Sequence, residues 1–214
     1  MEKIWVYGTG GHAAVIVDMI LSMKVFDIAG FVDDDINKKD KIFYKHAKIY
    51  SPAEFVRMNQ KFNIKNILFA IGSNEIRKKL TEQFSVLNFP TIIHPTAIIG
   101  KFVEIDSGTV VMPYTVIETE AKVGKHCIIN NNAIIGHNSV IGDYCHVGGR
   151  VILSGGTKVG HCCLIGIGAS VTPLTTIGNQ CTVGAGSVIA KDVPDNSFMF
   201  GNPARKVSNF LTNC

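Results

Sequence analysis

The 214-residue chain has little charge, and its charged residues are scattered. Charged residues make up 18% of the sequence, and the formal net charge is only +4. The longest basic run is three residues, Arg77-Lys78-Lys79. Nucleic-acid-binding domains are usually marked by strongly basic patches, so this composition argues against nucleic acid as a partner.

Two other common signals are missing. The N-terminal apolar run, Ile4 to Tyr7, is too short for a signal peptide or a membrane span, so we expect a cytoplasmic protein without a span. The six cysteines all lie beyond residue 126 and form no Cys-x-x-Cys pair, which argues against a zinc ribbon or a redox motif. We expect reduced, buried thiols and no bound metal.

Glycine is abundant, with 21 residues, and its distribution divides the chain. Sixteen of the glycines lie between Gly100 and Gly201, and the other five are at positions 8, 10, 11, 30 and 72. The change in character falls near His94-Pro95. We therefore expect two domains, residues 1–95 and residues 96–214.

The first part alternates between short apolar runs and segments with helical periodicity. Strands are expected at 4–7, 28–32, 66–71 and 91–93, and helices at 12–23, from 52 and at 73–84. Ser51-Pro52-Ala53-Glu54 has a cap residue, a proline at the first helical position and an acid in the first turn. This alternation predicts a small Rossmann-like domain with a parallel sheet.

The second part is a hexapeptide repeat. From Ile99 to Ile189 every sixth residue is Ile, Val or Leu, over sixteen consecutive hexads. The fourth residue after each of these is always small or Val. Such a unit supplies one short strand and one corner, and stacked coils bury a continuous aliphatic column. The pattern predicts a β-solenoid with 18-residue coils, in which Cys127, Cys145 and Cys163 stack inside.

The combination of motifs resembles one enzyme family. The motifs that carry this resemblance are Tyr7-Gly8-Thr9-Gly10-Gly11-His12, Ala70 to Lys79, Gly136 to Val147, and Gly201-Asn202-Pro203-Ala204-Arg205-Lys206-Val207. The chain is similar to the PglD-like and NeuD-like nucleotide-sugar acetyltransferases of the hexapeptide-repeat superfamily. The resemblance implies a left-handed parallel β-helix, a homotrimer, acetyl-CoA bound between neighbouring columns, and a nucleotide sugar bound by the N-terminal domain.

The resemblance also implies a catalytic base. His137 matches the family histidine that accepts a proton from the acceptor amine, a role that suits an imidazole with an ordinary pKa of about 6.5. The family usually has an acid directly after this histidine, whereas this chain has Asn138. An amide can orient the ring but carries no charge, so another carboxylate such as Asp143 is an alternative support.

Further site residues follow from the same resemblance. Nine residues after the base, His146 matches the histidine near the acetyl group, and Arg205 and Lys206 offer cations to coenzyme A phosphates. The implied cofactor-binding set is His146, Ile167, Gly168, Ala185, Pro203, Arg205 and Lys206. The implied substrate-binding set lies at the expected carboxyl ends of the N-terminal strands: Gly10, Gly11, His12, Asp33, Asp34, Gly72, Ser73 and Asn74.

The expected reaction is acetyl transfer to the 4-amino group of a UDP-linked 4-amino-4,6-dideoxy sugar, for bacterial surface glycan or glycoprotein synthesis. The sequence leaves open dTDP, GDP and CMP as carriers, and O-acetylation of a sialic-acid-type sugar. A nucleotide-sugar-binding scaffold without catalysis is a further alternative. An NAD oxidoreductase is disfavoured because the second mononucleotide half is missing. A zinc hydratase on the same solenoid is disfavoured because the histidines do not reproduce that family's short His pair: His126, His137, His146 and His161.

Overall fold

The computed structural model describes residues 1–207, so Cys214 lies outside the described residues. Two units are present, and each is described by itself. Among the described residues, unit 1 contains residues 1–72 and 79–90, and unit 2 contains residues 73–78 and 91–207. The proposed functional division into 1–95 and 96–214 stays a prediction.

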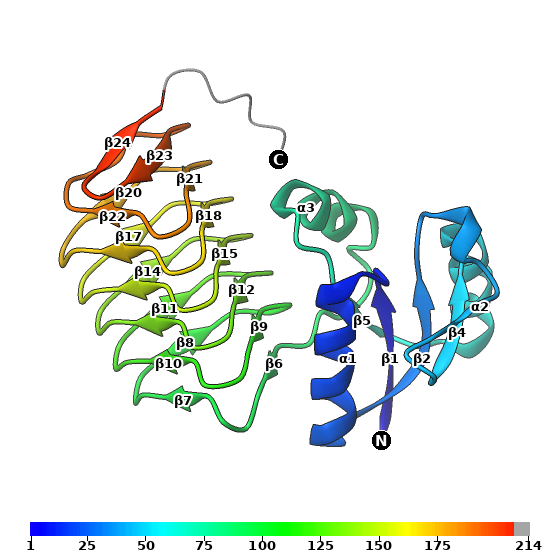
Figure 1. Ribbon diagram of the computed structural model, residues 1–214. Helices are drawn as coiled ribbons and strands as arrows, with labels where there is room; N and C mark the ends of the chain where they lie inside the picture. Colours follow the sequence, from blue (N-terminus) through cyan, green and yellow to red (C-terminus); the bar gives the residue numbers. More distant parts are fainter. Residues whose placement is uncertain (208–214) are drawn as a thin grey trace. The chain divides into compact units, whose positions relative to one another are not determined.

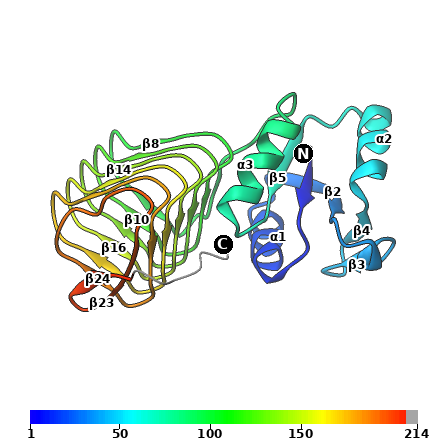
Figure 2. The ribbon, with the colours of Figure 1, turned by 90° about the horizontal axis from the view of Figure 1, so that it is seen from above.

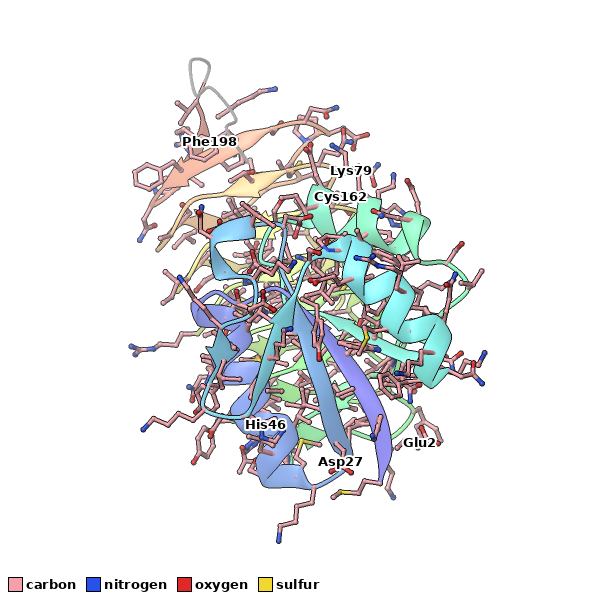
Figure 3. The ribbon with its side chains drawn as sticks, turned by 90° about the vertical axis from the view of Figure 1, so that its right-hand side faces the viewer. Glu2, Asp27, His46, Lys79, Cys162 and Phe198 are labelled. Atoms are coloured by element: carbon pink, nitrogen blue, oxygen red, sulfur yellow. The ribbon has the colours of Figure 1, made fainter. Side chains whose placement is uncertain are left out.

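Unit 1 is built on a five-stranded sheet with the order β3-β4-β2-β1-β5. The neighbours of β1 and β2 are parallel, and β3 pairs antiparallel with β4. The strands are β1 (Glu2–Tyr7), β2 (Phe26–Val32), β3 (Ile42–Phe43), β4 (Ala47–Tyr50) and β5 (Asn66–Phe69). Glu2 and Asp27, near the starts of β1 and β2, lie at the same end of the sheet (Figure 3).

The helices form where the sequence predicts them. They are α1 (Gly11–Met23), α2 (Pro52–Phe62) and α3 (Asn74–Gln83), whereas the short 3-10 helix η1 (Ile36–Lys38) was not expected. The start of α2 is confirmed in detail, because Ser51 and Glu54 form a reciprocal capping box and Pro52 occupies the first turn. The core of the unit packs aromatic edges against faces, with Trp5 centred 5.2 Å from Phe55.

One expectation for this sheet is wrong, and two of its strands were not expected. The strand expected at residues 91–93 is β6 (Ile92–Ile93), and it pairs with a strand of unit 2 instead of joining the parallel sheet. The sheet is completed by β3 and β4, which the periodicity does not reveal because they are only two and four residues long. Ile93 stands six residues before Ile99, so the hexad pattern itself extends one step further back than its predicted start.

Unit 2 is a parallel β-helix with three sheets. The six-stranded sheet consists of β7 (Ile98–Ile99), β10 (Val116–Ile117), β13 (Ile134–Ile135), β16 (Ile152–Leu153), β19 (Ser170–Val171) and β22 (Val188–Ile189). The five-stranded sheet consists of β8 (Glu104–Ile105), β11 (Lys122–Val123), β14 (Val140–Ile141), β17 (Lys158–Val159) and β20 (Thr176–Ile177).

The eight-stranded sheet closes the column. It contains β6, β9 (Val110–Val111), β12 (Ile128–Ile129), β15 (His146–Val147), β18 (Leu164–Ile165), β21 (Thr182–Val183), β23 (Phe198–Gly201) and β24 (Ala204–Lys206). The final pair, β23 and β24, is an antiparallel hairpin. Figure 1 shows the coils stacked from β7 to this hairpin, and Figure 2 shows successive coils overlapping when viewed from above.

The 18-residue coil is confirmed. Strands pair with strands 18 residues away, as Val116 does with Ile134. The repeating aliphatic and small residues face inward and form one buried cluster along the column. Cys127, Cys145 and Cys163 are buried in it as expected, and the five described cysteines are free thiols. The hydrogen-bonded Cys145 thiol raises the pKa of Cys163 to about 12, so this thiol stays protonated.

Three corners connect the sheets, and each repeats every 18 residues. The His137 corner joins the six- and five-stranded sheets and includes residues 118–121, 136–139 and 154–157. The Tyr144 corner joins the five- and eight-stranded sheets and includes residues 124–127, 142–145 and 160–163. The Ile167 corner joins the eight- and six-stranded sheets and includes residues 130–133, 148–151, 166–169 and 184–187.

Candidate functional site

His137 is an exposed imidazole on a rigid corner. Its backbone is hydrogen-bonded to the next coil, because the N–H of Gly156 donates to the His137 carbonyl at 2.8 Å. The His137 N–H donates to a carboxylate oxygen of Glu118 at 2.9 Å. The backbone is therefore held by the coils on both sides, while the ring remains accessible.

The ring of His137 contacts the neighbour that the sequence singled out. Its Nδ1 lies 2.9 Å from Oδ1 of Asn138, so the amide orients the imidazole. The other end of the same amide, Nδ2, donates a short hydrogen bond to Oε2 of Glu120. A carboxylate is thus connected to the histidine, although through an amide and from the preceding coil.

The far side of the ring lies over a glycine. A Cβ built on Gly155 would lie 2.7 Å from Cε1 of His137 and would overlap with Nε2. Gly155 occupies the position of His137 in the next coil, 18 residues along the chain. The absence of a side chain at Gly155 makes room for the Nε2 edge of the imidazole, the edge opposite the Asn138 contact.

The alternative support, Asp143, lies elsewhere. It is part of the Tyr144 corner, where its Oδ1 accepts the N–H of Lys125 at 2.9 Å. Its other oxygen lies 3.9 Å from Nδ1 of His161. The structure therefore connects His137 to Asn138, Glu118 and Glu120, and places Asp143 at a different corner.

The cofactor candidates gather around a second corner. Ile167, Gly168 and Ala185 are exposed residues of the Ile167 corner. His146 is half-buried on β15 in the adjacent eight-stranded sheet, with Nε2 3.5 Å from the side-chain nitrogen of Asn130. The Gly168 N–H donates to the Gly149 carbonyl at 2.9 Å. The Gly168 N–H is thus used in hydrogen bonding between coils. Ile167, in contrast, is 60% exposed.

The remaining cofactor candidates lie on the terminal hairpin. Pro203 is in the turn between β23 and β24, and Arg205 and Lys206 are exposed on β24. One guanidinium nitrogen of Arg205 donates to the carbonyl of Ala204 at 3.1 Å. Both cations are thus presented at the surface of the last coil, where an anionic ligand can reach them.

His137 and the cofactor candidates do not meet within one column. The His137 corner and the Ile167 corner border opposite edges of the six-stranded sheet. His146 lies on the sheet that faces away from the His137 corner, half a coil along the chain. In a single chain these groups therefore form two separate surfaces.

Most substrate candidates share one edge of unit 1. Gly10, Gly11 and His12 follow β1, Asp33 and Asp34 follow β2, and Gly72 follows β5. These three strands are adjacent, and their carboxyl ends meet, as in other open α/β sheets that bind ligands. Within the described residues, no non-neighbouring heavy atom lies within 4 Å of a Cβ placed at any of the three glycines.

Asp33 organises this edge. Its Oδ2 accepts the Thr9 N–H at 3.0 Å and pairs with Lys38 Nζ at 3.1 Å. Burial by itself would raise the pKa of Asp33, but the hydrogen bonds from Thr9, Asp35 and Lys38 outweigh it and hold the pKa below its usual value. The neighbouring Asp34 accepts the Tyr7 hydroxyl at 2.9 Å. The Asp33 carboxylate therefore ties the glycine-rich loop to the end of β2.

Ser73 and Asn74 belong to unit 2, whereas the other substrate candidates belong to unit 1. The Ser73 hydroxyl accepts the Ile76 N–H and caps α3. The Asn74 amide donates to the Cys163 carbonyl at 3.0 Å and accepts from Arg77 at 2.9 Å. The roles observed for both side chains are structural, and their contact with substrate stays a prediction.

Arg77 is a buried guanidinium that the sequence showed only as part of a motif. It is 2% exposed and donates to three backbone carbonyls of the Tyr144 corner: those of His126, Tyr144 and Cys145. Burial lowers the pKa of Arg77 to about 10, which still leaves it charged at neutral pH. This charge fixes the start of α3 on the column.

The four histidines that were considered as zinc ligands are dispersed over the column. They lie at the Tyr144 corner, at the His137 corner and on β15: His126, His161, His137 and His146. Among residues 1–207, no group of three or more His, Cys, Asp or Glu side chains is arranged to hold a metal ion. In the same part of the chain, none of the helices has the length and hydropathy needed to cross a membrane.

Sequence reasoning missed the two carboxylates beside His137 and the glycine beneath its ring. Two of these three residues, Glu120 and Gly155, stand at positions that the 18-residue period points to. Subtracting 18 from Asn138 leads to Glu120, and adding 18 to His137 leads to Gly155. The signal was therefore present, but it required the coil length to be applied to polar corners as well as to the aliphatic column.

Comparison with known protein families matches both units. The "PglD N-terminal domain" family matches residues 3–84, and the "bacterial transferase hexapeptide (six repeats)" family matches residues 120–155. A curated relative is UDP-N-acetylbacillosamine N-acetyltransferase of Bacillus subtilis (strain 168), 36% identical over 112 residues. That match spans half of this chain and half of the relative.

Solved structures match over nearly the full length. PerB from Caulobacter crescentus, in complex with CoA and GDP-perosamine, is 28% identical with a TM-score of 0.90, covering 97% of this chain and 98% of PerB. The acetyltransferase domain of PglB from Neisseria gonorrhoeae FA1090, in complex with acetyl coenzyme A, is 28% identical with a TM-score of 0.86. It covers 96% of this chain and 99% of the PglB domain.

These likenesses confirm the predicted fold class, a Rossmann-like parallel sheet followed by a left-handed β-helix. They also agree with the motifs from which the resemblance was inferred. In both its PglD-type N-terminal unit and its hexapeptide column, the chain is similar to the PglD-like nucleotide-sugar acetyltransferases of the hexapeptide-repeat superfamily.

Proposed function

We propose that the protein transfers the acetyl group of acetyl-CoA to the 4-amino group of a UDP-linked 4-amino-4,6-dideoxy sugar. The product would serve bacterial surface glycan or glycoprotein synthesis. The observation that carries the proposal is the exposed His137, whose Nδ1 is bonded to Asn138 while its Nε2 edge lies over Gly155, where only a glycine leaves room for the ring. The relatives that act on amino-sugar nucleotides support the substrate class.

The geometry suits a general base. With Nδ1 directed at an amide oxygen, the imidazole keeps its proton on Nδ1 and presents the Nε2 lone pair to a ligand. The amine nitrogen attacks the thioester carbonyl, Nε2 accepts the amine proton, and the C–S bond then breaks. The proton passes from Nε2 to the departing CoA thiolate, so the histidine returns to its starting state.

Coenzyme A would bind along the Ile167 corner and the terminal hairpin. Exposed apolar Ile167 and the surface around Gly168 and Ala185 suit the pantetheine chain, and Arg205 and Lys206 suit its phosphates. His146 lies on the adjoining sheet, where it can approach the acetyl end. These assignments follow the family resemblance and the exposure of the residues.

The complete site would form between copies of the chain in a homotrimer. The His137 corner and the Ile167 corner border opposite edges of the six-stranded sheet. Packing of two columns could therefore bring the His137 corner of one chain next to the Ile167 corner of another. The outward residues of this sheet are mostly apolar: Ile98, Val116, Ile134, Ile152, Ser170 and Val188. The equivalent positions on the five-stranded sheet are mostly polar or charged. An apolar outer face of this kind favours contact with another protein surface.

The nucleotide sugar would bind at the carboxyl edge of the unit 1 sheet. The glycine-rich loop precedes α1, and among the described residues no side chain caps that helix and no acid occupies its first turn. A diphosphate is therefore compatible with the start of α1, where backbone N–H groups point outward. Asp34, which is exposed, would contact the ribose or base. Free thiols throughout the described column fit a reaction in the cytoplasm.

The test is direct. Purified protein is mixed with acetyl-CoA and a panel of UDP-, dTDP-, GDP- and CMP-linked 4-amino sugars, and acetylated product is measured by mass. We expect transfer to an amine, and a loss of at least about a hundredfold in kcat for His137→Ala. The matched control is His161→Ala, because His161 is an exposed histidine at another corner and should leave the rate unchanged.

Two results would contradict the proposal. Transfer to a sugar hydroxyl with no transfer to any amine would assign the protein to O-acetylation. Binding of a nucleotide sugar without any acetyl transfer would indicate a scaffold. An undiminished rate in His137→Ala would leave acetyl transfer in place but exclude this histidine as the base.

A further inference from the structure

The support for His137 comes from the preceding coil. Glu120 and Asn138 occupy the same position of the His137 corner, 18 residues apart, with left-handed φ values of 60° and 57°. Their side chains point along the column so that Glu120 Oε2 accepts from Asn138 Nδ2. The other end of the Asn138 amide, Oδ1, lies 2.9 Å from His137 Nδ1. Three side chains from two coils thus form one continuous line of hydrogen bonds.

The chemistry of each group sets the direction of this line. An ionised carboxylate can only accept hydrogen bonds, so Glu120 requires the NH₂ end of Asn138 to face it. The amide oxygen must then face the ring, and an oxygen can only accept. His137 Nδ1 therefore carries the proton, and Nε2 carries the lone pair.

We propose that Glu120 is a positioning residue that acts through Asn138 to hold His137 in the tautomer with a basic Nε2. The proposal rests on the proposed acetyl transfer, for which that nitrogen accepts the amine proton. The amide passes no proton onward, so the proton stays on the imidazole until the CoA thiolate takes it. During that interval the imidazolium faces the amide oxygen, whose orientation the carboxylate maintains.

The arrangement also explains how this chain functions without an acid directly after the histidine. With an acid at position 138, the carboxylate would accept from Nδ1 directly. Here the acid lies one step further away, and the amide between the two has no preferred orientation of its own. Without Glu120, Asn138 could rotate its NH₂ toward the ring and favour the Nε2–H tautomer, which has no lone pair where the substrate binds.

The decisive variant is Glu120→Gln, because glutamine keeps the size of the side chain but can both donate and accept. We expect kcat to fall about ten- to hundredfold, with KM for acetyl-CoA unchanged, because only the fraction of His137 in the correct tautomer reacts. The matched control is Glu104→Gln, which removes one exposed carboxylate that pairs with Lys122 on the five-stranded sheet. This control should retain the wild-type rate.

A rescue variant separates tautomer control from general structural damage. In the Glu120→Gln background, Asn138→Asp places an acceptor-only group directly beside Nδ1. This double variant should recover most of the lost kcat. Aspartate tolerates the left-handed backbone found at position 138, so the corner can retain its conformation.

A second readout does not depend on activity. The full-length protein is labelled with ¹⁵N-histidine, the His137 signals are assigned by their loss in His137→Gln, and long-range ¹H–¹⁵N correlation reports the tautomer. We expect Nδ1–H in the wild type and a shift toward Nε2–H in Glu120→Gln. If no substrate is acetylated, the proposed function fails and these spectra still decide the hydrogen-bond arrangement.

The proposal is overturned by any of three results. The wild type could show the Nε2–H tautomer, or Glu120→Gln could retain both the wild-type tautomer and a kcat within twofold of wild type. A lowered kcat that Asn138→Asp does not rescue would show that Glu120 serves the fold of the corner and not the state of the histidine.

Discussion

A single glycine makes room for the ring of His137, the proposed catalytic base. The imidazole lies over Gly155, and a Cβ there would overlap with Nε2. Gly155→Ala should therefore displace the ring or obstruct the approach of the amine. We expect kcat to fall about a hundredfold, since small displacements of a catalytic group have effects of this size. Steady-state kinetics with the preferred amino sugar would measure the change.

Stability serves as the control for this glycine. The backbone of Gly155 is not in the left-handed region, and the atoms in the way belong to the end of an exposed side chain. The alanine variant should therefore unfold at nearly the same temperature as the wild type. An alanine variant with full activity would show that Nε2 is not approached from this side.

At the scale of an element, the Tyr144 corner depends on a buried histidine that must stay neutral. The His126 ring stacks parallel on Tyr144 with 5.4 Å between centroids. Burial, followed by the nearby charge of Arg77, lowers the pKa of His126 to about 4. The usual value in an unfolded chain is about 6.5. The unfolded state therefore binds a proton more readily than the folded state between these two values.

The sign of the effect follows from this difference. The stability contributed by neutral His126 is fully present above pH 6.5 and is lost as the pH falls toward 4, amounting to about 3 kcal/mol over that interval. His126→Asn removes the titration and suits the left-handed backbone at this position, where φ is 52°. The variant should lose correspondingly less stability than the wild type on acidification.

Urea unfolding at pH 7, 6, 5 and 4.5 would measure the free energy of unfolding of both proteins. The informative quantity is the difference between their pH slopes, because other titrating groups contribute equally to the two proteins. Parallel curves for wild type and variant would contradict a lowered pKa for His126.

The elements differ in how far the sequence foretold them. The column was predictable because one aliphatic residue per hexad must face inward, a constraint that every coil repeats. The helix at Ser51 was predictable from local capping chemistry. In contrast, β3 and β4 were missed because a strand as short as Ile42–Phe43 has no periodicity to detect. The placement of β6 depended on pairing with β9, which no local signal encodes.

The candidate site was foreseen less completely than the fold. His137 and Asn138 were identified by resemblance, and the coil length could have added Glu120 and Gly155. The structural use of Asn74 could not be anticipated, because its partner is the backbone carbonyl of Cys163, 89 residues away. Contacts to backbone atoms leave no trace in the identity of the residue that supplies them.

At the scale of the whole molecule, the chain should assemble through the apolar face of the six-stranded sheet. Ile152 on this face is 42% exposed and borders an open hollow with Asn132, Ile134 and Arg150. Light scattering after size exclusion should give about three times the chain mass of 23.2 kDa. Ile152→Lys should shift the protein toward smaller species, because a charge would be buried in the interface.

A matched substitution is available on another sheet. Val140 is outward-facing on the five-stranded sheet and 40% exposed, so Val140→Lys adds the same charge at similar exposure. This variant should keep the wild-type mass. A monomeric wild type at micromolar concentration, or equal behaviour of the two lysine variants, would show that the six-stranded sheet is not the interface.

The 18-residue coil has a consequence for insertions and deletions. Inserting six residues between Glu120 and Asn138 would shift the later sequence by one strand and one corner. His137 would then lie at a different corner of the column from Glu120. Inserting eighteen residues after Gly155 would lengthen the column by one coil and leave the contacts of His137 at its corner unchanged. We therefore expect the column to tolerate changes of length, natural or engineered, only in multiples of 18 residues and only after Gly155.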